Sequence, residues 1–181
     1  MVKKISFFFI AALLLGAGVI MANSSDFILT SESIKNNQTL PNEQVLNGFG
    51  CSGENISPDL KWQGAPEGTK SFALLVHDPD APRPTGWWHW LVINIPASKT
   101  EFKKGEKPAA PMLETVTDFK TLGYGGACPP AGHGVHHYNF TIHALDVETL
   151  DITVDTDPNT VEKIVKEHSI ANATITALYQ R

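Results

Sequence analysis

Residues 71–96 read SFALLVHDPDAPRPTGWWHWLVINIP and predict a strand, a rigid loop and a second strand. Apolar residues alternate with smaller or polar ones over 72–76 and again over 91–95, the pattern of half-buried strands. Three prolines between them, within 78–86, fix φ and remove backbone donors, so we expect the loop to be stiff. A stiff loop between two strands is a suitable frame for a binding site.

Charged and ionisable side chains gather at the ends of these predicted strands. Asp78 and Asp80 are separated by one proline and are expected to face one region of space, to which His89 returns from the second strand. Alternation places Trp88 and Trp90 on one strand face and Trp87 on the other. One of these tryptophans is expected at the rim of a pocket and the others in the core.

The N-terminal residues 1–22 have the features of a secretory signal peptide. Lys3 and Lys4 precede an uncharged apolar run over 5–20, and Ala22 offers a small residue at the cleavage point. An uncleaved anchor is the alternative, because the apolar run is close to the shortest that spans a bilayer. The first interpretation predicts a periplasmic or secreted protein whose residues 23–181 form a single domain.

Charge and cysteine content restrict the function further. The chain has 19 acidic against 14 basic residues and no basic stripe, which argues against nucleic-acid binding and against electrostatic attachment to anionic membranes. Cys51 and Cys128 are the only cysteines. An even number in an oxidising compartment favours a disulfide between them, with two buried free thiols as the alternative.

The remaining segments add strands and one helix. Strands are predicted over 26–30, near 60–62 and over 171–179, whereas 96–121 is expected to be a long surface connection with at most short strands. A glycine- and proline-rich segment over 122–134 allows close backbone approach. The next strand, 136–145, should turn His136, Tyr138, Phe140, Ile142 and Ala144 inward.

One helix is predicted, near the C-terminus. Either Asp157 or Asn159 is placed to cap it, and Pro158 suits its first turn. Apolar residues at helical spacing over 161–168 should face a sheet.

Catalysis by the same residues is the alternative to simple binding. His89 and the histidines of 133–137 could join the aspartates in a zinc site, but His136 and His137 are adjacent in a strand and point to opposite faces. An acid–base pair could come from Asp78, Asp80 and His89, yet no G-x-S-x-G or comparable nucleophile signature is present. We therefore expect no metal and no other cofactor, with a hydrolase or metal-dependent enzyme as the alternative.

Three separated motifs together resemble one known family. D-P-D-A-P at 78–82, W-W-H-W at 87–90, and G-x-H-x-Y at 134–138 after C-P-P-A-G are similar to the phosphatidylethanolamine-binding protein (PEBP) family, in its bacterial Raf-kinase-inhibitor-like branch. The resemblance implies a mainly β, antiparallel two-sheet PEBP-like fold with a C-terminal amphipathic helix, and a small pocket for phosphate-type head groups. It implies that the pocket is lined by Asp78, Asp80, Pro82, His89, Pro130, His136 and Tyr138.

One position departs from the family pattern. Relatives usually carry arginine after the motif histidine, where this chain has His137. Histidine is not a permanent cation, so an ion pair at this position is either lost or pH-dependent.

Together these features predict an exported, non-catalytic protein that binds a small anionic ligand and acts as an inhibitor or modulator of a protein partner. No nucleic acid and no stable membrane insertion after signal cleavage are expected. The sequence is also compatible with a homodimer.

Overall fold

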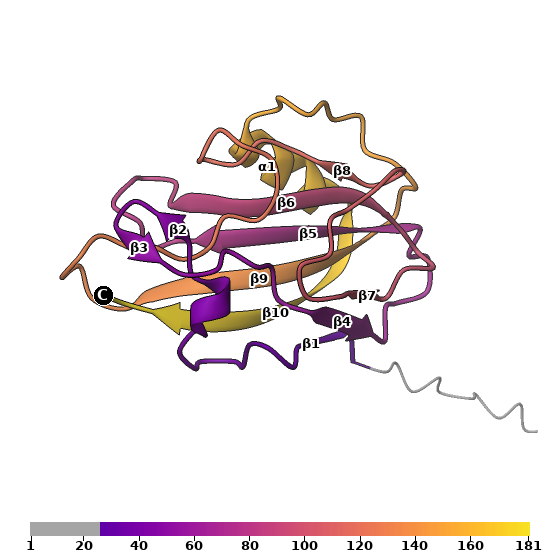
Figure 1. The fold of residues 1–181 in the computed structure, drawn as a ribbon. Helices are drawn as coiled ribbons and strands as arrows, with labels where there is room; N and C mark the ends of the chain where they lie inside the picture. Colours follow the sequence, from indigo (N-terminus) through magenta and orange to yellow (C-terminus); the bar gives the residue numbers. More distant parts are fainter. Residues whose placement is uncertain (1–25) are drawn as a thin grey trace, which may run out of the picture.

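Residues 26–181, which the computed structural model describes, are mainly antiparallel β-sheet with one 11-residue helix (Figure 1). The predicted signal peptide lies outside these residues. The elements are β1 (Ile28–Thr30), the 3-10 helix η1 (Asn42–Gln44), β2 (Asn47–Gly48), β3 (Cys51–Ser52), β4 (Leu60–Gln63), β5 (Ser71–Asp78), β6 (Trp87–Pro96), β7 (Glu101–Phe102), β8 (Leu113–Glu114), β9 (His136–Leu145), α1 (Pro158–His168) and β10 (Ser169–Tyr179).

Five strands make the large sheet, in the order β10-β9-β5-β6-β8. A three-stranded sheet, β1-β4-β7, packs on one side of it, and β2 and β3 form a two-stranded hairpin. The fold class predicted from sequence is therefore confirmed. Apart from its first residue, which ends β6, the segment 96–121 contains only the two-residue strands β7 and β8, as predicted.

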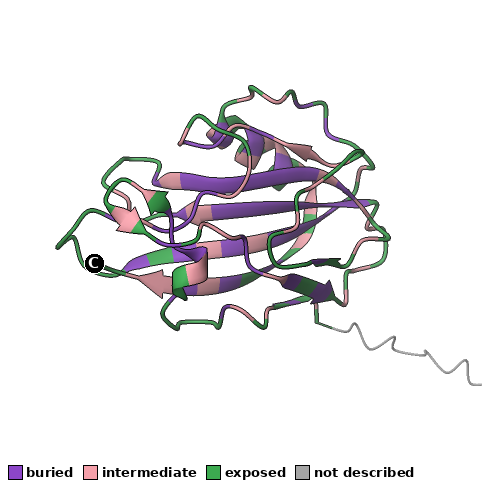
Figure 2. Ribbon diagram, viewed as in Figure 1, coloured by how far each residue is buried: buried purple, intermediate pink, exposed green. Residues whose placement is uncertain are grey.

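The neighbouring strands β5 and β6 are covered on both faces, so the expectation of half-buried strands is wrong for both of them (Figure 2). Phe72, Leu74 and Val76 join the core between the two sheets, whereas Ala73 and Leu75 join a second core beneath the helix. There are two cores because α1 covers the face of the large sheet opposite to the three-stranded sheet. The alternation along β5 therefore separates residues of the two cores rather than buried residues from exposed ones.

β6 changes face twice, which the sequence pattern does not reveal. Register shifts against β5 fall at His89 and near Asn94, whose φ of 56° is in the left-handed region. The bulge at His89 sends Trp88 into the helix-side core and Trp90 into the core between the sheets. The prediction that these two tryptophans share a face is therefore wrong, because a bulge adds one residue and inverts the alternation.

β9 follows the predicted alternation without interruption. Tyr138, Phe140, Ile142 and Ala144 are all buried in the core between the sheets, and His136 is buried at the same face. β9 pairs with β5 on one side and β10 on the other. Its first residues therefore lie beside the end of β5, where the proline-rich loop begins.

α1 is capped by Asp157, one of the two predicted residues. The Asp157 carboxylate accepts hydrogen bonds from the backbone N–H groups of Asn159 (3.0 Å) and Thr160 (3.4 Å). Val161 and Val165 of the helix are fully buried against the sheet. No helix within residues 26–181 has both the length and the apolar character that a membrane span requires.

Candidate functional site

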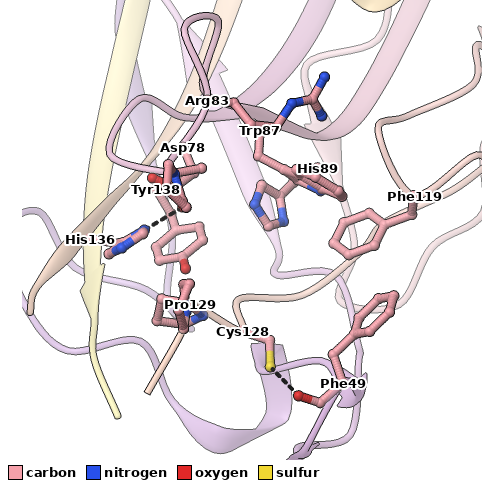
Figure 3. Close-up of a pocket in the computed structure, with 13 residues that line it drawn as sticks. Phe49, Asp78, Arg83, Trp87, His89, Phe119, Cys128, Pro129, His136 and Tyr138 are labelled. Carbon is pink, nitrogen blue, oxygen red and sulfur yellow. Dashed lines mark hydrogen bonds and ion pairs between the residues drawn. The ribbon is translucent and has the colours of Figure 1, made fainter. Parts of the chain in front are cut away.

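A cavity of about 230 Å³ opens at the end of the large sheet where β5 ends and β6 and β9 begin (Figure 3). The proline-rich loop, the Gly50 turn between β2 and β3, and the loop before β9 complete its walls. Its lining residues are Phe49, Asp78, Ala81, Pro82, Arg83, Trp87, His89, Phe119, Cys128, Pro129, Pro130, His136 and Tyr138.

Six of the seven residues proposed for the pocket lie around this cavity, and Asp80 does not. Instead, the Asp80 carboxylate accepts hydrogen bonds from the backbone N–H and the ring Nδ1 of His137, at 2.8 and 2.7 Å. Burial acts to raise the pKa of Asp80, but the hydrogen bonds from His137 outweigh it and hold the pKa below its ordinary value. The Asp80 carboxylate thus bonds His137 outside the cavity, because Asp80 stands in the turn after β5 has ended. His137 therefore gives Asp80 an ionisable partner.

Asp78 begins a chain of three polar side chains that runs from the cavity to the surface. Its Oδ2 lies 2.7 Å from Nδ1 of His136, and Nε2 of His136 lies 2.8 Å from Nδ1 of His133. Asp78 and His136 are almost completely buried, whereas His133 is exposed. Both ring nitrogens of His136 are therefore occupied, so this residue offers the cavity its ring rather than an unpaired donor.

His89 is held in one tautomer. Its Nδ1 lies 2.7 Å from the carbonyl oxygen of Gly125, and because a carbonyl only accepts, Nδ1 carries the hydrogen. Its ring meets those of Tyr138 and Phe119 edge-on, at centroid distances of 5.1 and 5.3 Å. Burial lowers the pKa of His89 to about 4, so the ring is neutral at pH 7.

Two enclosed donors at the cavity have no hydrogen-bond partner within residues 26–181. They are the Tyr138 hydroxyl and the Trp87 indole nitrogen. Burial, together with the nearby Asp78 charge, raises the pKa of Tyr138, which therefore stays a neutral donor. Unpaired buried donors are rare in folded proteins and mark places where water or a ligand is bound.

An aromatic wall faces His136 across the cavity, and sequence reasoning missed most of it. Trp87 meets Phe119 edge-on at 5.3 Å, and Phe119 stacks on Phe49 at 6.0 Å. Arg83 lies 4.9 Å over Trp87 and pairs with Asp118 at 3.0 Å, so its charge is already compensated. Only Trp87 had a signal, its place in W-W-H-W. Phe49 and Phe119 come from loops distant in sequence.

Two cross-links hold the cavity wall on the Phe49 side. Cys51 and Cys128 form the disulfide favoured by the sequence, which joins β3 to the loop before β9. Arg181 donates to the carbonyl oxygens of Pro129 (2.6 Å), Gly50 (3.1 Å) and Phe49 (3.2 Å). The guanidinium group therefore bridges the same two segments as the disulfide.

The described lining residues contain no serine, threonine or lysine, and Cys128 is oxidised. Throughout residues 26–181, no three His, Cys, Asp or Glu side chains are grouped as metal ligands would be. This geometry gives the hydrolase alternative no support.

Both the sequence and the fold of this chain match those of known proteins. The family model described as phosphatidylethanolamine-binding protein matches residues 30–180. The chain belongs to the phosphatidylethanolamine-binding protein family. Among its family relatives, Escherichia coli YbcL is 42% identical over 165 residues, which cover 88% of this chain and 90% of YbcL. Escherichia coli YbhB is 44% identical over 156 residues, which cover 83% of this chain and 98% of YbhB.

Solved structures of PEBP family members have the same fold as this chain. The crystal structure of Escherichia coli YbcL, described as a new member of the mammalian PEBP family, matches with a TM-score of 0.84 over 87% of this chain and 99% of YbcL. The PEBP homologue CT736 from Chlamydia trachomatis matches with a TM-score of 0.74 at 27% identity, over 86% of this chain and 97% of that one.

Proposed function

We propose that this PEBP family member is exported and binds a small anionic ligand, such as phosphate or the phosphate of a lipid head group, in the cavity beside Asp78 and His89. The pair of unpartnered donors on Tyr138 and Trp87 is the observation that supports this most directly. An anion oxygen would give each donor the acceptor that the protein does not provide. The small volume and the apolar walls favour a compact head group over an extended polar ligand.

The test is a titration of the purified protein with inorganic phosphate and phosphoethanolamine, followed by NMR. We expect dissociation constants from high micromolar to millimolar, equivalent to about 4 to 6 kcal/mol. Tyr138→Phe removes one donor and should weaken phosphate binding about threefold to tenfold, the scale of one neutral hydrogen bond. His137→Ala, on the opposite strand face, is the matched control. Chemical-shift changes that avoid the cavity residues would contradict the proposal.

Export and a protein partner belong to the same proposal. The disulfide supports export, since disulfides persist mainly in oxidising compartments. A partner is proposed to contact the cavity mouth, where the Phe49 side chain is 75% exposed. Cell fractionation with and without residues 1–22 tests export. A cytoplasmic, fully reduced protein would contradict export. Cross-linking from position 49 tests the partner, and the absence of any cross-linked protein would contradict it.

A further inference from the structure

We propose that the cavity selects an anion that still carries a hydrogen, such as a phosphomonoester monoanion, over a fully deprotonated oxyanion such as sulfate, because Asp78 and His89 present acceptors to the ligand. This inference rests on the proposed function and names the chemical class that the same site would take.

Asp78 can act only as an acceptor in the arrangement seen here. Its Oδ1 accepts the backbone N–H of Asp80 at 2.9 Å, and its Oδ2 lies 2.7 Å from Nδ1 of His136. A carboxylate has about four lone-pair positions, so two protein donors leave about two for a ligand. A ligand oxygen without hydrogen would meet these lone pairs with repulsion.

His89 presents a second acceptor. Gly125 fixes the hydrogen on Nδ1, which leaves the lone pair on Nε2. Nε2 has no hydrogen-bond partner within residues 26–181, and His89 is one of the residues that line the cavity. The ring is neutral near pH 7 because burial keeps its pKa at about 4.

The other ionisable groups around His89 do not reverse this preference. They are Asp78 and His77 of β5, His136 and Tyr138 of β9, and the Arg83–Asp118 pair. His136 is occupied at both nitrogens, Arg83 is paired, and Tyr138 remains a donor. The site therefore offers two acceptors to a ligand hydrogen and two donors, on Tyr138 and Trp87, to ligand oxygens.

A phosphomonoester monoanion matches this set, since its P–O–H group donates while its other oxygens accept. Its second pKa is about 6, so it loses that hydrogen as the pH rises through this value. Affinity should then fall by up to tenfold per pH unit above about 6. Sulfate has no hydrogen to donate near neutral pH and should bind weakly at every pH tested.

The experiment compares methyl phosphate with sulfate by calorimetry at pH 5.5 and pH 8, using the purified protein. We expect methyl phosphate at pH 5.5 to bind at least tenfold more tightly than sulfate, and to lose at least tenfold in affinity at pH 8. Equal affinity of the two anions, unchanged with pH, would overturn the selectivity while leaving anion binding intact. If neither anion binds, the proposed function fails and this inference fails with it.

Asp78→Asn provides the decisive variant, because the isosteric amide replaces one acceptor with a donor. The preference for methyl phosphate over sulfate should shrink to less than threefold. Asp146→Asn changes an exposed carboxylate that pairs with His168 and does not line the cavity, so it should leave the preference unchanged. Thermal melts establish that both variants fold. An unchanged preference in folded Asp78→Asn overturns the assignment of the carboxylate. The ¹⁵N shift of His89 Nε2 reports its bare lone pair directly, and a protonated Nε2 in the free protein at pH 7 would overturn the assignment of the ring.

Discussion

Nδ1 of His136 lies 2.7 Å from Oδ2 of Asp78, and the two side chains are only 1% and 4% exposed. One residue further along β9, Nδ1 of His137 lies at the same distance from Oδ2 of Asp80, but those side chains are 49% and 39% exposed. Strand alternation thus sends neighbouring histidines to neighbouring aspartates in different surroundings. The first pair builds the cavity and the second ties the proline-rich loop to the outer face of β9.

The two pairs should differ in their contribution to stability. Asp78→Ala leaves the buried Nδ1 of His136 without its partner, and we expect a loss of about 1 to 3 kcal/mol in the free energy of unfolding. Asp80→Ala removes an exposed pair and should cost about 1 kcal/mol or less. Urea denaturation measures both. Equal losses for the two variants would show that burial does not distinguish the pairs.

Two buried histidines predict a loss of stability in mild acid. Burial lowers the pKa of His89 and of His143 from about 6.5 to about 4. Between these values the unfolded chain binds protons that the folded chain does not, so stability is full above about pH 6.5 and falls until about pH 4. The loss is about 3 kcal/mol per histidine at most.

Urea denaturation across this pH range, with His143→Gln, checks the effect. The variant should show a shallower decline than the wild type. Asn172→Ala, which changes the residue opposite His143 on β10 without removing a titrating group, is the control. Parallel pH profiles for the wild type and His143→Gln would rule out a contribution from His143.

The disulfide should contribute substantially to stability. Cys51 and Cys128 are separated by 77 residues, and closing a loop of this length in the unfolded chain is worth about 4 kcal/mol in the chain-entropy model. The double variant Cys51→Ala/Cys128→Ala should lose about this amount in urea denaturation. A loss below about 1 kcal/mol would mean that the loops are held mainly by other contacts.

Arg181 is predicted to position the cavity wall in a way that lysine cannot. Its planar group reaches three carbonyl oxygens on two segments, whereas an ammonium group has no such fork. Arg181→Lys should weaken phosphate binding about threefold to tenfold and speed the reduction of the disulfide by a small thiol. Lys70→Ala, an exposed charge away from the cavity, is the control. If Arg181→Lys keeps the wild-type phosphate affinity and the wild-type rate of disulfide reduction, Arg181 does not position the cavity wall.

Sequence reasoning succeeded where one periodicity holds through a whole element. The strand at 136–145 and the C-terminal helix are examples, since the alternation of the strand and the Asp157 cap of the helix agree with the structure. It failed in β6, because the residues on both sides of the His89 bulge are apolar tryptophans and the inserted residue leaves no gap in the pattern. Register there is decided by pairing with β5, which the local sequence does not encode.

The residues of the candidate site also divide into those that sequence reasoning placed correctly and those that it did not. Asp78 and His89 were expected together from the strand–loop–strand pattern, and Tyr138 was added by the family resemblance. All three line the cavity. Asp80 was misplaced because two residues after a strand the alternation no longer applies and the turn decides direction. Phe49 and Phe119 could not be predicted, since only tertiary packing brings their loops beside Trp87.

The pairing of β5 with both β6 and β9 has a consequence for folding kinetics. The β5–β6 hairpin is local in sequence and can form early. β9 pairs with β5 only after the long segment between β6 and β9 has closed into a loop. The cavity lies at this late junction, so the chain acquires its binding site only when the slow, long-range step is complete. A ligand of this cavity would therefore slow unfolding without accelerating refolding, because it has nothing to bind until the barrier has been crossed.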